Sequence, residues 1–224
     1  EVARLVAQIP VLAGANGKTQ LSADFGQLKQ VPSQGDSDIF SVSAWAKRWA
    51  GPARPLFAAV LVNEAREHAA AFGLGRFDPD RPAVQAWIDE RVALWSHLVN
   101  EETGRALSEE IRAGVDAGES VRDLQARVER VFRFADVVRS ERIARTESLG
   151  LANRGHLAVY EQSGVVAEKM WIATRDDRVR DAHLEADQQI VPLGSAFLVG
   201  GELLDAPGIG GSPSNVISCR CTVA

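Results

Sequence analysis

The 224-residue sequence is poor in cysteine, and its only two cysteines are Cys219 and Cys221. Two cysteines do not make a disulfide framework, and neighbours separated by one residue rarely bridge because the geometry is strained. We therefore expect free thiols or metal ligands, which fits a reducing compartment.

Long apolar runs are also missing. No segment approaches the roughly 20 apolar residues that cross a bilayer, so no membrane segment is expected. The N-terminal residues lack the basic and apolar pattern of a secretory signal. The chain begins with Glu1 instead of methionine, which is compatible with a processed chain or a fragment of a longer one.

Two common catalytic motifs are absent as well. There is no Gly-x-Ser-x-Gly nucleophile elbow and no Gly-x-x-x-x-Gly-Lys phosphate loop. The glycine-rich stretch at residues 208–211 lacks the strand-to-helix context that a nucleotide loop needs. We therefore assign no catalytic residues, expect no cofactor, and predict that the protein is not an enzyme.

The composition is that of a globular protein, with 46% apolar and 25% charged residues. The net charge of -5 argues against a chain whose whole surface binds nucleic acid. Its positively charged residues are mostly arginines. A GC-rich genome is the favoured explanation, and phosphate recognition by arginine is the alternative.

The pattern predicts a mainly α fold with a small C-terminal α+β module. Residues 1–40 are expected to form an N-terminal arm and linker, residues 41–164 a helical region, and residues 165–224 the small module. The module is predicted from short strand patterns and from Gly200-Gly201, a two-residue hairpin signal between two apolar runs.

Four helices are predicted in the middle of the chain. The first spans Ser41 to Gly73 with a break at Gly51-Pro52 and Pro55, and the second follows the loop that ends near Arg81. The third begins at a capping box formed by Ser120 and Asp123. Its expected inner face is Val121, Leu124, Val128, Val131 and Phe132. The fourth covers about Asp136 to Glu161, and Gly164 provides its C-terminal stop.

The module is expected to contain three kinds of segment. Met170 to Thr174 and the two runs beside Gly200-Gly201 are strand candidates, residues 205–214 an ordered loop, and Val216 to Val223 a closing strand.

Arginines recur every three or six residues along the third and fourth helices. This spacing places neighbours on related helix faces. A ridge that contacts DNA phosphates is one interpretation, and a solvated face balanced by acidic residues is the favoured alternative. The DNA-binding candidates are Arg127, Arg130, Arg133, Arg139 and Arg142.

A second group of residues is expected to anchor the module. Arg145, Thr146 and Glu147 lie within a helix, where Arg145 or Glu147 is expected to be a buried ion-pair anchor instead of a catalytic group. His183, Cys219 and Cys221 are candidate zinc ligands, and a packed, hydrogen-bonded cluster is the favoured alternative. His156 lies in an apolar stripe and is expected to be a packed histidine.

These motifs occur in a recognisable order. Ile143-Ala144-Arg145-Thr146-Glu147 is followed by Gly164, Trp171, Asp177-Arg178 and His183, and the chain ends with Cys219-Arg220-Cys221. From about residue 85 onward this set resembles the phage Mu F-like minor head proteins, also called the MuF domain or head morphogenesis family. Many relatives carry an extra cysteine or histidine where this chain has Arg180 and Asp181, which weakens the zinc interpretation.

The resemblance implies a structural minor head protein of a tailed phage or phage-like particle. Expected partners are the portal protein, other head or neck proteins and double-stranded DNA. The expected location is the virion, at the head or portal vertex, and the host cytoplasm during assembly. Its expected roles are head morphogenesis and DNA ejection. The alternatives are an ADP-ribosyltransferase-like effector and a zinc-stabilised interaction module.

Overall fold

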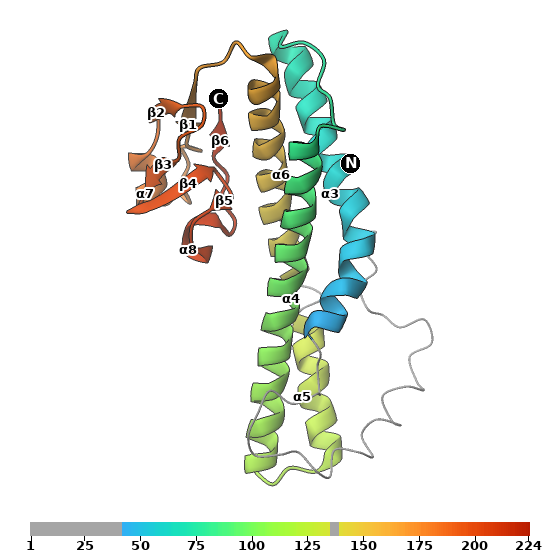
Figure 1. Cartoon of the computed structure of the whole chain (residues 1–224). Helices are drawn as coiled ribbons and strands as arrows, with labels where there is room; N and C mark the ends of the chain where they lie inside the picture. Colours follow the sequence, from blue (N-terminus) through green and yellow to red (C-terminus); the bar gives the residue numbers. More distant parts are fainter. Residues whose placement is uncertain (1–41, 135–138) are drawn as a thin grey trace. The chain divides into compact units, whose positions relative to one another are not determined.

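The computed structural model describes residues 42–134 and 139–224 (Figure 1). Its helices are α3 (Val42–Phe72), α4 (Pro82–Asp116), α5 (Val121–Phe134), α6 (Ser140–Ser163), α7 (Asp181–Glu185) and α8 (Pro213–Val216). Its strands are β1 (Glu168–Ile172), β2 (Ile190–Pro192), β3 (Phe197–Val199), β4 (Glu202–Ala206), β5 (Ile209–Gly210) and β6 (Thr222–Val223). The predicted fold class, mainly α with a small C-terminal α+β region, is confirmed. The predicted arm at residues 1–40 lies outside the described residues.

The described residues divide into two compact units, and α3 and α4 contribute to both. The first unit contains residues 42–53 and 93–134, and the second contains residues 54–92 and 139–224. The domain boundaries predicted from the sequence remain a prediction.

Helix α3 corrects one prediction, because it continues through Gly51, Pro52 and Pro55 without a break. A proline inside a helix costs about 3 kcal/mol, since it removes a backbone hydrogen bond and its ring crowds the preceding turn. Gly51 has no Cβ to meet the ring of Pro52. The turns that follow bury Phe57 and Leu61, and burying each such side chain contributes about 1.5–3 kcal/mol. Burial therefore offsets the proline cost.

In the first unit, α5 packs against the C-terminal part of α4. Its predicted capping box is confirmed, because the backbone N–H of Asp123 donates to Ser120 Oγ and the N–H of Ser120 donates to the Asp123 carboxylate. The predicted inner face of α5 is wrong at both ends: Val128 is buried, whereas Val121 and Phe132 are exposed. Burial on α5 is therefore concentrated in its middle turns, at Val128.

In the second unit, α6 lies against α3 at a very short distance. A Cβ added to Gly155 would lie 2.8 Å from the carbonyl oxygen of Leu61 and 3.2 Å from the N of Ala65. The two helix backbones therefore meet directly at this glycine. Helix α6 ends at Gly164, whose φ of 68° is the left-handed conformation predicted for its stop.

Two small antiparallel sheets lie beside α6 (Figure 1). Their strand orders are β2-β1-β6 and β3-β4-β5. The predicted hairpin is confirmed, since β3 pairs with β4 and Gly200 and Gly201 both have positive φ. A strand predicted at Met170–Thr174 is present as β1, which begins two residues earlier and ends at Ile172. Trp171, Phe197 and Leu204 are fully buried between these elements.

The C-terminal segment corrects two further predictions. Residues 205–214 are not only loop, because β4 extends to Ala206 and residues 209–210 form β5. The predicted closing strand is limited to Thr222–Val223, and a helical turn, α8, precedes it.

Within the two described stretches, none of the helices has both the length and the apolar character required to cross a bilayer.

Candidate functional site

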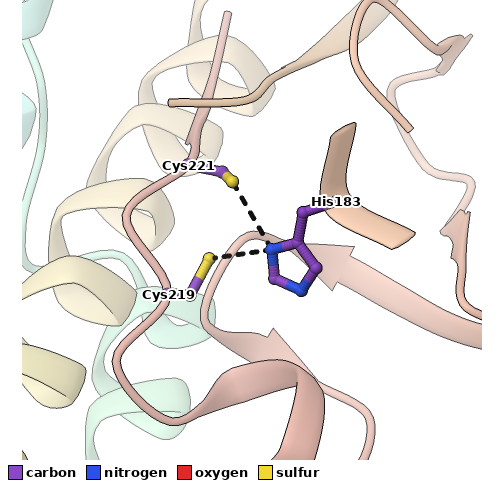
Figure 2. Close-up of side chains that lie close together, drawn as sticks. All are labelled: His183, Cys219 and Cys221. Carbon is purple, nitrogen blue, oxygen red and sulfur yellow. Dashed lines mark hydrogen bonds between the residues drawn. The ribbon is translucent and has the colours of Figure 1, made fainter. Parts of the chain in front are cut away.

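Three buried side chains converge in the second unit: His183, Cys219 and Cys221 (Figure 2). The Nδ1 atom of His183 lies 3.6 Å from Cys219 Sγ and 3.5 Å from Cys221 Sγ. All three ligand atoms lie within 4.8 Å of one another. The sequence prediction that brings these residues together is geometrically correct, although His183 and Cys219 are 36 positions apart and both hairpin strands lie between them.

Local structure aims each member of this His–Cys–Cys cluster at the others. His183 lies on the short helix α7, and the two cysteines flank Arg220 in the extended segment before β6. Alternate residues of an extended chain point to the same side, so both sulfurs face the imidazole. Neither cysteine is in a disulfide.

The imidazole of His183 also packs against an aromatic side chain. Its ring stands edge to face with Trp171, with ring centroids 5.4 Å apart, and Trp171 makes a similar contact with Phe197. His183 Nε2 and Trp171 Nε1 are buried and have no hydrogen-bond partner among the described residues. The polar interactions of His183 are therefore concentrated at Nδ1, the atom that faces the sulfurs.

The two thiols titrate as a pair. The hydrogen bond from the Cys219 thiol lowers the pKa of Cys221, and His183 and the backbone of Thr174 lower it further. The same hydrogen bond, together with burial, raises the pKa of Cys219. The cluster thus favours one thiolate at Cys221 and one proton between the two sulfurs.

Helix α6 fixes the segment that carries the cysteines. Thr146 Oγ1 accepts a 3.0 Å hydrogen bond from the backbone N–H of Ser218, whose φ is positive.

Glu147 forms a two-pronged ion pair with Arg91 at 2.8 and 3.0 Å, and both side chains are only 14% exposed. Of the two residues expected to form a buried ion pair, Glu147 does so, but its partner lies on α4 and not in the C-terminal module. Arg145 does not, because its side chain is exposed and pairs with Glu141.

Sequence reasoning missed Asn153, the residue that ties α6 most closely to the C-terminal strand. Its amide donates to the carbonyls of Pro207 and Cys221, and its oxygen accepts from the N–H of Val223 and the hydroxyl of Thr222. An asparagine on the apolar face of a helix, one turn before Leu157, was the available signal.

The loop before α7 contains a second missed residue, Asp176. Its carboxylate accepts from the backbone N–H of Arg178 at 3.0 Å and from the guanidinium of Arg220 at 2.5 Å. The predicted Asp177 is exposed, and so is the side chain of Arg178. Asp176, and not the predicted Asp177, therefore holds the side chain of Arg220, the residue between the two cysteines in the sequence.

An open pocket of about 850 Å³ lies beside the cluster, and Cys219 is part of its wall. Glu64 lines it from α3, and burial, reinforced by nearby Glu67, raises the pKa of Glu64. The other charged lining residues are Arg145, Arg178, Arg180 and Arg220. The wall is therefore predominantly cationic.

The five DNA-binding candidates do not share one environment. Arg127, Arg130 and Arg133 belong to the first unit, and Arg139 and Arg142 belong to the second. Arg127 is held by Glu110 and Glu119 at 2.8 and 2.6 Å, and Arg130 lies 3.6 Å from Glu110. Arg133 and Arg142 are exposed and form no side-chain ion pair with the described residues. These two are the candidates left available for phosphate.

Comparison with known proteins places the chain in a family. The NAD(+)--arginine ADP-ribosyltransferase EFV of Enterococcus faecalis (strain ATCC 700802 / V583) is 27% identical to it over 136 residues. That match covers 59% of this chain and 28% of the relative, so the chain spans little more than a quarter of that protein. No solved structure matches the chain. The family described as Phage Mu protein F like protein matches residues 105–224, more than half of the sequence. The chain therefore belongs to the Phage Mu protein F like family.

Proposed function

We propose that this chain is a structural minor head protein that acts at the portal vertex of a tailed phage or phage-like particle. Membership of the Phage Mu protein F like family carries the proposal and supports a phage head-related protein. Its role there would be head morphogenesis or DNA delivery, with the protein located in the virion.

The surface of the first unit supports binding to other head proteins. Six large apolar side chains of this small unit are exposed: Leu94, Leu98, Val115, Val121, Phe132 and Phe134. Val121 is 67% exposed and Phe134 is 58% exposed. Groups of exposed large apolar residues commonly mark protein-binding surfaces. The portal assembly is the partner that the family membership favours.

A portal-binding assay tests this part of the proposal. The full chain is mixed with the portal assembly from the same source, and the two are co-sedimented. We expect the chain to sediment with the portal and to remain monomeric without it. A chain that stays in the supernatant at micromolar concentrations contradicts portal association.

DNA contact is the second part of the proposal, and it rests on Arg133 and Arg142. Each phosphate contact changes the slope of log affinity against log salt concentration by about 0.9 for duplex DNA. Replacing both arginines by glutamine should therefore lower the slope by about 2 in a fluorescence anisotropy titration.

Arg105→Gln is the matched control for the DNA experiment. Arg105 is exposed, but Glu102 and Glu109 already engage its guanidinium. We expect this variant to keep the slope of the unmodified chain. An unchanged slope in the double variant would remove these arginines from the proposal.

An NAD⁺-dependent ADP-ribosyltransferase activity is the alternative, favoured by the name of the Enterococcus relative. The cationic pocket is the place where a dinucleotide would bind, and Glu64 is the carboxylate in its wall. Isothermal titration calorimetry with NAD⁺ discriminates the two functions. We expect no heat of binding, and saturable binding that Glu64→Gln abolishes would favour the enzyme.

A further inference from the structure

The His–Cys–Cys cluster contains both cysteines of the sequence and the one histidine of α7. All three side chains are at most 4% exposed. Two thiols and an imidazole that share one buried position are the donor set of soft or borderline metal ions, above all Zn²⁺ and Cu⁺. Hard ions such as Mg²⁺ and Ca²⁺ need oxygen ligands, which the cluster does not offer.

The distances fit a tetrahedral ion. With Zn–S near 2.3 Å and Zn–N near 2.0 Å, a tetrahedral angle separates the sulfur and nitrogen ligands by about 3.5 Å. The two sulfur-to-Nδ1 distances are 3.6 and 3.5 Å. One ion can therefore bind Nδ1 and both sulfurs without a large movement of any side chain.

Charge favours the same conclusion. Two buried thiolates would be costly to hold without a cation, because burial disfavours the charged form. A Zn²⁺ ion bound by two thiolates and a neutral imidazole gives a centre with no net charge.

The fourth coordination position of such an ion would face the pocket. Cys219 is the member of the cluster that lines the open pocket, so the pocket is the side from which a fourth ligand could approach. Zinc sites with three protein ligands keep their fourth position for water or an exchangeable ligand. The arginine-rich wall beside Cys219 suits a hydroxide or another small anion there.

We propose that His183 Nδ1, Cys219 Sγ and Cys221 Sγ bind one Zn²⁺ ion whose fourth ligand is a water molecule from the pocket. The ion would hold α7 and the C-terminal segment together, although His183 and Cys221 are 38 residues apart in sequence. It would also replace the pair of thiol hydrogen bonds with stronger metal–ligand bonds.

Cobalt titration of the full chain tests the proposal. The untagged, reduced chain is titrated with Co²⁺ and followed by absorbance, because tetrahedral thiolate coordination gives strong visible and sulfur-to-metal charge-transfer bands. We expect one equivalent to saturate the bands and one equivalent of Zn²⁺ to abolish them. Elemental analysis of chain purified without chelator should find about one zinc per chain.

Variants assign the ligands. Cys219→Ser and Cys221→Ser should each weaken the charge-transfer band and lower cobalt affinity at least tenfold. His97→Gln, which changes an exposed histidine outside the cluster, should leave the titration unchanged. If a cysteine variant does not fold, the unmodified chain still decides: bound Zn²⁺ should protect both thiols from a thiol-reactive dye.

Three outcomes overturn the proposal. They are no charge-transfer band in folded, reduced chain, bands that persist in both cysteine variants, and thiols that react equally fast with and without Zn²⁺. Purification with copper or iron that Zn²⁺ cannot displace would overturn the assignment to zinc.

Discussion

At the scale of the residue, single polar side chains determine how the C-terminal segment is placed on α6. Asn153 satisfies four groups of that segment, and Thr146 satisfies a fifth at Ser218. Because Asn153 is almost fully buried, each group that loses its partner is cut off from water as well. The stability of the candidate site therefore depends on one amide that has no chemical role.

Asn153→Ala tests this dependence. It leaves the carbonyl of Pro207 and the N–H of Val223 buried without their partner, which should lower the free energy of unfolding by about 2–4 kcal/mol. Urea denaturation followed by circular dichroism measures the loss. Asn63→Ala, at an exposed position, should change it by less than about 0.5 kcal/mol. Equal effects of the two variants would contradict the account.

His156 should make stability depend on pH. It stacks on His68 at 3.9 Å, and burial, reinforced by the His68 charge, lowers its pKa to about 4. The unfolded chain binds a proton near pH 6.5 and the folded chain only near pH 4, so stability is full above pH 6.5 and falls as the pH drops through this window. Solvent screening limits the loss to about 1–2 kcal/mol.

The variant His156→Gln isolates this effect. Carboxylates and thiols titrate in the same acidic range, so the measured quantity is the difference between the unmodified chain and the variant in urea denaturation at several pH values. We expect the variant to lose about 1–2 kcal/mol less between pH 6.5 and 4. The exposed His97→Gln should follow the unmodified chain, and a His156→Gln curve parallel to both would show that His156 titrates normally.

At the scale of the element, close backbone contact fixes α6 against α3. Gly155 permits that contact, and Gly150 permits a similar one with the loop before β5, where an added Cβ would lie 3.1 Å from the carbonyl oxygen of Gly208. Both neighbours are backbone atoms that cannot rotate away. These glycines therefore act as spacing elements, although each lowers intrinsic helix propensity by about 1 kcal/mol.

Gly155→Ala should force the two helices apart and lower the free energy of unfolding by about 1–3 kcal/mol, despite the better helix propensity of alanine. Gly194→Ala is the matched control, because its added Cβ meets nothing within 4 Å. Thermal unfolding of the two variants provides the comparison. A Gly155→Ala variant that melts with the unmodified chain would place the helices farther apart than described.

Elements were predicted well where the signal is local. Two such signals are confirmed. They are the capping residues Ser120 and Asp123 at the start of a helix, and the glycine pair Gly200-Gly201 between two apolar runs. The predicted break in α3 was wrong. The energetic cost of a proline inside a helix can be read from the local sequence, whereas the burial of Leu61, which offsets that cost, depends on residues that are distant in the sequence.

The same distinction applies to the candidate site. The residue types and the order of the motifs were enough to predict from the sequence that His183, Cys219 and Cys221 form one cluster. Asn153 and Asp176 could not be predicted in this way, because their partners are backbone groups and an arginine from distant segments.

At the scale of the whole molecule, exposed large apolar side chains are denser in the first unit than in the second. The first unit exposes six large apolar side chains among its 54 described residues, all of them on α4 and α5, whereas the second exposes seven among its 125. A head protein that joins other components needs such a surface, and the first unit is where we expect it.

The double variant Phe132→Ser, Phe134→Ser tests that surface. Both rings are exposed, so the free energy of unfolding should change by less than about 1 kcal/mol. Affinity for the portal assembly should fall at least tenfold in the co-sedimentation assay. Leu198→Ser, which removes a similarly exposed side chain of the second unit, should bind as the unmodified chain does. Unaltered binding by the double variant would move the interface elsewhere.

The most direct test of the central claim, a structural role at the portal vertex, is quantitative mass spectrometry of purified particles from the source. Peptides of this chain are scored against those of the portal and major capsid proteins. The account predicts recovery of the chain in a low copy number, comparable with the portal and far below the major capsid protein. Its absence from particles that contain both proteins would contradict a vertex component and favour the enzymatic alternative.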